Sequence, residues 1–205
     1  MPSLLFEIEH GRNSGKIIAG TDEAGRGPLA GPVVAAAVII PEHFPADLAD
    51  AINDSKKISE KKRDALFPRI LETCIHGIAQ CSAQEIDEIN ILQASLLAMK
   101  RSVALLSAQP YIVLVDGNKS PLIAPIRAIP IIKGDSKSLS IAAASILAKV
   151  TRDRLMQQLH EEFPHYGWAH NAGYPTKDHV EALTTHGITT HHRRSFGPVK
   201  RACER

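Results

Sequence analysis

Apolar and β-branched residues gather in short runs that stop at glycine, proline or acidic residues, a pattern typical of buried strands. Two of these runs lie near the N-terminus and bracket a glycine-rich loop, which favours a hairpin. The clearest run, YIVLV, leads directly into an Asp-Gly pair. The predicted strands are residues 16–21, 33–40, 75–81, 111–115 and 127–132.

Segments with helical periodicity lie between and after these strands. They predict helices over residues 59–74, 82–106, 138–163 and 176–187, followed by a basic, irregular tail. Ser59 and Thr176 can cap the first and the last helix, and Ser82 opens a capping box. Pro68 predicts a kink or a break in the first helix, and we expect another break near Asn90.

The order of these elements is strands first, then strands alternating with helices, then helices. It predicts an α/β fold with a mixed sheet flanked by helices and a C-terminal helical extension. A chain of 205 residues suits one domain. We therefore expect a single domain over residues 1–205, in which about residues 164–205 form the helical and basic extension.

Composition indicates which residues fill the core and in which cellular compartment the protein works. Aromatic residues make up only 4% of the chain, so alanine, isoleucine, leucine and valine must fill most of the interior. The three cysteines lack C-x-x-C spacing, which argues against a disulfide framework and against a zinc site. The N-terminus shows no signal-peptide pattern, and no apolar run approaches the ~20 residues that span a bilayer. We expect a cytoplasmic protein that does not enter a membrane.

The net charge of +2 does not by itself indicate a nucleic-acid-binding protein. Lysine and arginine, however, gather in three segments that could form one basic surface for a polyanion. Candidate contacts to such a polyanion are Lys56, Lys57, Lys137, Arg193 and Arg194. The alternative is that each cluster is an ordinary solvated face.

Four acidic residues stand at the ends of predicted strands or just beyond them. Ligands of open α/β sheets collect outside the carboxyl ends of the strands, and grouped carboxylates repel one another unless cations neutralise them. An all-oxygen set suits Mg²⁺ or Mn²⁺. The candidate metal ligands are Asp22, Glu23, Asp116 and Asp135, and the loop Gly25-Arg26-Gly27 is a candidate phosphate contact. The alternative for the Asp-Glu pair is a solvated acidic turn.

Several long motifs, in order along the chain, resemble the ribonuclease HII family. The first is DEAGRGPLAGPV at residues 22–33. The others are DSKK, DG, KGDSK, the stretch from SIAAASILAKV to RD, GYPT and HRRSF, at residues 54–57, 116–117, 133–137, 140–153, 173–176 and 192–196. The similarity spans about residues 16–199, and ordered motifs of this length are far more specific than one short pattern.

The resemblance implies a ribonuclease-H-like fold and an endonuclease that cleaves the RNA strand of RNA–DNA hybrids. It also implies nicking beside single ribonucleotides embedded in duplex DNA, with roles in ribonucleotide removal and RNA primer processing. The family's metal-binding carboxylates fall on Asp22, Glu23, Asp116 and Asp135. Its ribose-reading loop falls on Gly25, Arg26 and Gly27, and its junction-sensing tyrosine on Tyr174.

Phosphodiester chemistry agrees with that assignment. Two divalent ions ~3.5–4 Å apart can activate a water and stabilise the leaving oxygen, giving 3′-hydroxyl and 5′-phosphate ends. Mn²⁺ or Mg²⁺ is the expected cofactor. We expect a monomer whose partners are RNA–DNA hybrids and ribonucleotide-containing DNA.

Two other interpretations were open from the sequence. One is a non-catalytic nucleic-acid-binding module, although a negative cluster gives a polyanion binder no advantage. The other is the related ribonuclease HIII family, which carries a long N-terminal substrate-binding domain. Only about fifteen residues precede the first predicted strand here, which favours ribonuclease HII.

Overall fold

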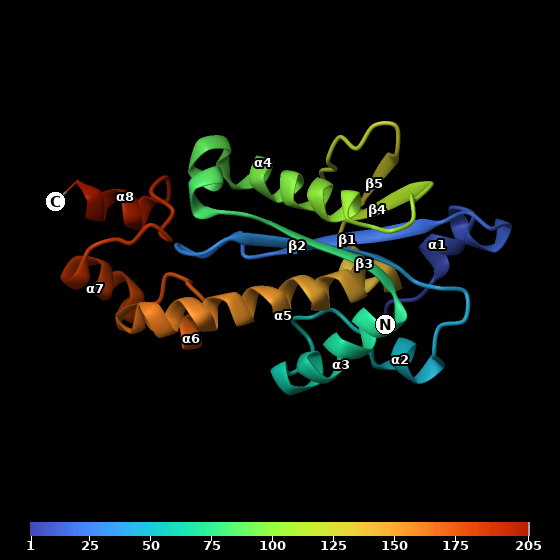
Figure 1. Cartoon of the computed structure of the whole chain (residues 1–205), viewed down its shortest axis with the longest axis horizontal. Helices are drawn as coiled ribbons and strands as arrows, with labels where there is room; N and C mark the ends of the chain where they lie inside the picture. The colour runs from blue at the N-terminus through green and yellow to red at the C-terminus, as the bar shows by residue number, and fades with distance from the viewer. Residues whose placement is uncertain (205) are drawn as a thin grey trace.

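A five-stranded mixed sheet forms the centre of the computed structural model, which describes residues 1–204 (Figure 1). The strand order is β3-β2-β1-β4-β5. β1 pairs antiparallel with β2 and parallel with β4, while β3 and β5 pair with β2 and β4 at the two edges. The strands are β1 Ile18–Ala24, β2 Val33–Ile39, β3 Ile75–Cys81, β4 Ile112–Asp116 and β5 Arg127–Ile131. This confirms the predicted mixed sheet and its five strands.

Two long helices cover the two faces of the sheet, α4 (Ala83–Ala104) on one side and α5 (Leu139–Glu162) on the other (Figure 1). Each face has its own apolar cluster, one between the sheet and α5 and one between the sheet and α4. Alanines dominate the first turns of α5 and the middle of β2, and all of these are fully buried. On the α5 side, the small side chains of Ala36 and of residues 142–144 let the helix lie close against the sheet, whose strand β1 carries Asp22 and Glu23.

The remaining helices surround this three-layer core. The predicted N-caps are confirmed: the side chains of Ser59, Ser82 and Thr176 each accept a hydrogen bond from the backbone N–H three residues on. The helices are α1 Leu5–Glu9, α2 Ala46–Ala51, α3 Glu60–Thr73, α6 Trp168–Asn171, α7 Lys177–His186 and α8 Gly197–Cys203. Three short 3₁₀ turns are η1 Arg12–Ser14, η2 Gly134–Ser136 and η3 Pro164–Tyr166.

Of the two helix interruptions predicted, at Asn90 and at Pro68, only the break at Asn90 is confirmed. Asn90 does break α4, with φ 66° and ψ 163°, and its side chain accepts hydrogen bonds from the N–H groups of Leu92 and Gln93, so it caps the second half of the helix. Pro68, in contrast, lies inside a continuous α3, so no break occurs there. Buried residues on both sides of it, Phe67 and Ile70, hold the helix against the core.

The C-terminal segment is more ordered than the sequence indicated. The predicted irregular tail contains α8, which opens with Gly-Pro and buries Val199 against the other C-terminal helices. Backbone hydrogen bonds tie this segment to the glycine-rich loop after β1: Leu29 donates to Gly173, and Arg193 donates to Leu29. The division into a catalytic domain with an extension from about residue 164 stays a prediction.

Within residues 1–204, no helix has both the length and the apolar character that crossing a membrane requires.

Candidate active site

One pocket of about 250 Å³ gathers most of the predicted site residues. It opens at the carboxyl ends of β1 and β4, the two parallel central strands. Asp22 and Glu23 lie near the end of β1, and Asp116 is the last residue of β4. The predicted residues that line the pocket are Asp22, Glu23, Gly25, Arg26, Gly27, Lys56, Asp116 and Tyr174.

Asp22 and Glu23 share this pocket although β1 continues through both of them. The sequence placed the end of the strand at Thr21, but β1 stays paired with β2 as far as Ala24. Only its pairing with β4 stops at Thr21. Beyond that point one side of β1 has no neighbouring strand, so both carboxylates can reach the opening left beside Asp116.

Asp135 lies next to Asp116, in the turn η2 that follows β5. The N–H groups of Gly134 and Asp135 donate to Oδ1 of Asp116, over 2.6 Å and 3.4 Å. A Cβ at Gly134 would lie 2.6 Å from Cδ1 of Ile141, so a larger residue here would displace the end of that buried side chain. The hydrogen bonds from η2 thus fix the fourth acid beside the third.

Repulsion and burial strain the ion-free carboxylate cluster. Burial, and then the charges of Glu23 and Asp116, raise the pKa of Asp22 well above its ordinary value. Burial also raises the pKa of Glu23, against the opposing effect of Arg26, whose guanidinium lies 3.3 Å from Oε1. Asp135 has a raised pKa because of burial and then of Asp116. The site therefore favours bound cations or protons.

Lys56 is the cation that faces this cluster from the protein itself. Burial works to lower the pKa of Lys56, but nearby carboxylates outweigh it and the pKa is raised. The carboxylates responsible are Asp22, Asp135, Asp54 and Asp116. Lys56 therefore stays charged over the pocket.

The donor set fits hard divalent ions. Every acidic ligand offers oxygen, and Oε2 of Glu23 is buried without a hydrogen-bond partner in residues 1–204. As the side chains are placed, no three His, Cys, Asp or Glu residues of the described chain form a ready metal site. Arg26 and the N–H of Gly134 hold oxygens of Glu23 and Asp116, so these carboxylates would have to turn toward an ion.

The loop Gly25-Arg26-Gly27 and Tyr174 form one wall of the pocket. Gly25 has φ +98°, and a Cβ there would lie 2.0 Å from Nε of Arg152, so only glycine fits. A Cβ at Gly27 would lie 3.3 Å from Cε1 of Tyr174. The tyrosine ring therefore packs directly beside the loop.

Arg193 differs from its prediction as a surface contact. Its side chain is fully buried (0% exposed), and its guanidinium donates to four backbone carbonyls, those of residues 25, 26, 31 and 32. Arg193 therefore cannot touch a nucleic acid in this arrangement. Arg193 instead holds the glycine-rich loop in place through these hydrogen bonds to its carbonyls.

Arg152 is a second buried arginine that holds the loop, and the sequence alone predicted no such role for it. It donates to the carbonyls of Ala30 and Pro32 in the loop and of Ala172 in the C-terminal segment. Burial lowers the pKa of Arg152 to about 10. Burial, and then the charge of Arg152, lower the pKa of Arg193 to about 9. Both arginines remain charged at neutral pH.

Two further pocket residues stand in the quoted motif of residues 140–153 but were not predicted as site residues. Ser145 of α5 hydrogen-bonds Ser55 over 2.7 Å and helps to hold the charged form of Asp22. Lys149, one turn further along α5, lines the same pocket and forms an ion pair with Asp153. The motif that contains them was recognised, but their place in the pocket follows only from the packing of α5 against β1. Lys137 is exposed, two residues beyond Asp135, and does not line the pocket.

Comparison with known proteins identifies the group to which this arrangement belongs. The model of the family described as ribonuclease HII matches residues 19–199. The chain belongs to the ribonuclease HII family. A curated ribonuclease HII from Marinomonas sp. is 57% identical over 191 residues, which cover 93% of this chain and 94% of that protein.

Solved structures of related ribonucleases have the same fold as this chain. A ribonuclease H2 from Pyrococcus horikoshii has a TM-score of 0.77 at 28% identity, over 92% of this chain and 97% of that one. A Bst ribonuclease HIII solved with Mn²⁺ has a TM-score of 0.78 at 21% identity, over 100% of this chain and 73% of that one, and shows the shared fold. The ribonuclease-H-like fold is therefore confirmed.

Membership of the ribonuclease HII family settles the class of activity. The protein is a metal-dependent endonuclease that hydrolyses the RNA strand of RNA–DNA hybrids. The interpretations as a non-catalytic binding module and as a ribonuclease HIII are thereby set aside.

Proposed function

We propose that this ribonuclease HII also nicks duplex DNA on the 5′ side of a single embedded ribonucleotide. The supporting observation is that one pocket joins the carboxylates to the Gly-Arg-Gly loop and to the ring of Tyr174. A ribose held by the loop would bring its 5′ phosphate to the carboxylates that directly precede the loop in β1. In the cell, this activity would serve ribonucleotide removal and RNA primer processing.

The loop is suited to binding a 2′-hydroxyl because Arg193 occupies its carbonyls and leaves its amide N–H groups for the substrate. The carbonyls of Gly25 and Arg26 accept hydrogen bonds from buried Arg193. Among hydrogen bonds outside the helices and sheet ladders of residues 1–204, none is donated by the N–H of Arg26 or Gly27. Those amides are free to donate to a sugar hydroxyl or a phosphate, and the 2′-hydroxyl is what distinguishes RNA from DNA.

Asp22, Glu23, Asp116 and Asp135 are the residues that would hold Mn²⁺ or Mg²⁺. Two such ions would supply a water activated for in-line attack and stabilisation of the leaving 3′ oxygen. Glu23 keeps one oxygen unpaired for this purpose, and Ser145 supports Asp22 in its charged form. This arrangement needs no attack by the 2′-hydroxyl.

Lys56 and Lys137 are proposed contacts to the nucleic-acid backbone. Lys56 lies in the pocket beside the carboxylates, where it can pair with the phosphate that is cut. Lys137 is exposed and follows η2, two residues before α5 begins. Every proposed site residue comes from one chain, so we propose that a monomer suffices for cleavage.

Calcium is expected to support substrate binding with at least about a hundredfold slower cleavage than Mn²⁺. Ca²⁺ takes longer and looser oxygen ligation than Mg²⁺, so the geometry of in-line attack should be lost while charge neutralisation remains. Fluorescence anisotropy of a labelled hybrid, alongside single-turnover cleavage, measures both effects. Cleavage in Ca²⁺ at the Mn²⁺ rate would contradict the proposed metal site.

The proposed function is tested with three duplexes of the same base sequence: a hybrid, a DNA with one ribonucleotide, and an all-DNA control. We expect Mn²⁺ or Mg²⁺ to give cleavage of the first two and none of the third, and a chelator to stop it. Cleavage of the hybrid without any cleavage at the single ribonucleotide would remove the second activity. Comparable cleavage of the all-DNA duplex would remove 2′-hydroxyl reading.

A further inference from the structure

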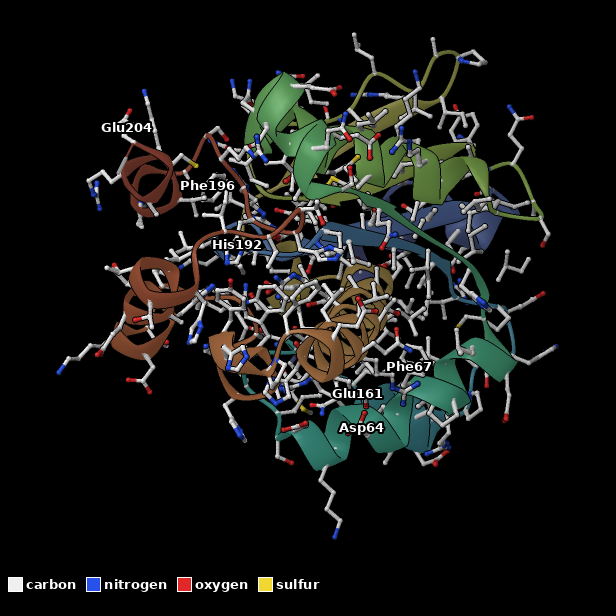
Figure 2. All side chains as sticks on the ribbon, turned by 60° about the vertical axis from the view of Figure 1, so that its left-hand side comes forward. Asp64, Phe67, Glu161, His192, Phe196 and Glu204 are labelled. Carbon is white, nitrogen blue, oxygen red and sulfur yellow. The ribbon has the colours of Figure 1, made fainter. Side chains whose placement is uncertain are left out.

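Two histidines lie in the interior among the C-terminal helices, behind the wall that carries Tyr174. His179 is on α7 and is 0% exposed, and His192 lies on the segment leading to α8 (Figure 2). The rings of Tyr166 and Trp168 pack against His192, with centroids 4.7 Å and 5.3 Å away. Nothing in the chemistry described so far uses either histidine.

The hydrogen bonds of His179 allow only one placement of its proton. The indole N–H of Trp168 can only donate, and it lies 3.1 Å from Nε2 of His179. Nε2 must therefore accept, which puts the proton of the neutral ring on Nδ1. That Nδ1–H donates to the backbone carbonyl of Tyr174 over 3.0 Å.

His192 completes the same network. Its Nδ1 accepts from the backbone N–H of Thr189 over 2.9 Å, so its proton is on Nε2. This Nε2–H points at Nε2 of His179, 3.1 Å away, so His192 and Trp168 share the one lone pair of that nitrogen. Burial lowers the pKa of both rings, to about 3 for His192, which keeps the pair neutral near pH 7. Thr189, His192 and His179 form a directed chain of donors and acceptors that ends at Tyr174.

Tyr174 is held through its backbone. Its N–H donates to Asn171, and its carbonyl accepts from the N–H of Thr176 and from His179. Its side chain makes no hydrogen bond within residues 1–204, and the residue is 46% exposed at the pocket. The backbone hydrogen bonds at residue 174 and the packing beside Gly27 therefore set the direction of the ring, and His179 supplies one of those hydrogen bonds.

We propose that His179 is a positioning residue for Tyr174: its Nδ1–H fixes the carbonyl of Tyr174 and so aims the ring at the sugar beside the ribonucleotide. This inference rests on the proposed role of Tyr174 in cleavage at single ribonucleotides. His179 itself never touches the nucleic acid. Its removal should affect cleavage at a single ribonucleotide more than binding to plain duplex.

Two amide substitutions separate this role from general stabilisation. In His179→Asn the amide nitrogen can occupy the position of Nδ1 and still donate to Tyr174, but the acceptor for Trp168 is lost. In His179→Gln the amide oxygen can still accept near the position of Nε2, but the donor to Tyr174 is lost. Both variants should melt below the wild type, because each leaves a buried polar group without its partner.

We expect His179→Gln to lower kcat at a single ribonucleotide about tenfold, the value of one hydrogen bond, and His179→Asn to lower it by no more than about threefold. The Kd for all-DNA duplex should stay within about twofold in both. His186→Asn and His186→Gln, on the exposed end of the same helix, are the matched controls and should change neither quantity. Assays are run at a temperature at which circular dichroism shows every variant folded.

A double-mutant cycle with Tyr174→Ala decides the mechanism. If His179 acts through Tyr174, His179→Gln should cause no further loss in the Tyr174→Ala background. Equal losses of kcat in the two amide variants, or a full tenfold loss added to that of Tyr174→Ala, would overturn the positioning role. If His179→Gln does not fold, His179→Asn decides alone: a near-wild-type kcat supports the role, and a tenfold loss overturns it.

The same cycle distinguishes this inference from the proposed function beneath it. If Tyr174→Ala leaves cleavage at a single ribonucleotide unchanged, the proposed role of Tyr174 fails, and the inference fails with it. If Tyr174→Ala slows that cleavage while His179→Gln leaves it unchanged, only the inference about His179 fails.

Discussion

Asp22→Asn should lower cleavage of an RNA–DNA hybrid by at least about a thousandfold and should raise the melting temperature of the ion-free protein. Asparagine keeps the hydrogen bond that Oδ1 of Asp22 accepts from the N–H of Glu23. It removes the negative charge, however, and with it the attraction for divalent ions. Activity and stability should therefore change in opposite directions.

The gain in stability follows from the raised pKa of Asp22. Because folding raises this pKa, the ionised carboxylate destabilises the fold, and its cost appears as pH rises through the range between the unfolded and the folded pKa. The advantage of Asp22→Asn in melting temperature should thus be larger at pH 8 than at pH 4. Mn²⁺ should raise the melting temperature of the wild type and have a smaller effect on the variant.

Calorimetry at both pH values, with and without Mn²⁺, and single-turnover cleavage measure these effects. Asp50→Asn, an exposed carboxylate on α2, is the control and should leave cleavage and melting close to wild type. An Asp22→Asn variant that cleaves at more than about a tenth of the wild-type rate would exclude Asp22 from the metal site.

Arg193→Met should destabilise the protein by about 3 kcal/mol, because the carbonyls that the guanidinium serves would lose their buried donor. For a chain of this length, that corresponds to a fall in melting temperature of roughly 6–12 °C. Cleavage at a ribonucleotide should also slow at temperatures where the variant is folded, since the carbonyls of Gly25 and Arg26 are no longer held inward.

Arg194→Met is the matched control for this change. Arg194 is the next residue and is exposed, so its replacement should alter the free energy of unfolding by less than about 0.5 kcal/mol. Thermal melting of the two variants side by side makes the comparison. A melting temperature of Arg193→Met close to that of Arg194→Met would show that the buried clamp contributes little.

The contrast between these neighbouring arginines shows where sequence reasoning reaches its limit. Both stand in the same basic motif, and both were reasonable contacts for a phosphate. Whether a guanidinium meets a phosphate or a backbone carbonyl depends on tertiary packing, because the turn after α7 brings residues 191–193 beneath the loop that follows β1. The residues that flank Arg193 in the sequence do not show that it will pack against the loop after β1.

Features governed by local chemistry were predictable. Pro32 and Pro41 bound β2, and serine or threonine stands at the starts of α3, α4 and α7, so these positions could be predicted directly. Short helices such as α1 and α2 were missed because five or six residues show no periodicity. The predicted break at Pro68 was wrong because α3 continues through it, with Phe67 and Ile70 buried on either side.

The grouping of Asp22 and Glu23 in one pocket was predicted from the sequence only in part. Alternation along a strand predicts that neighbouring side chains point to opposite faces. The structure brings both to one pocket because β4 stops pairing with β1 at Thr21. The relative lengths of two neighbouring strands decide this point, and a reading of either strand alone could not supply them.

The central claim is that the carboxylates act on the phosphate 5′ to a ribose held by the Gly-Arg-Gly loop. The most direct test is end-group mapping of the products from duplex DNA with one ribonucleotide, cut in Mn²⁺. We predict a single nick that leaves a 3′-hydroxyl on the upstream DNA and a 5′-phosphate on the ribonucleotide. A 2′,3′-cyclic phosphate, or a nick on the 3′ side of the ribonucleotide, would contradict it.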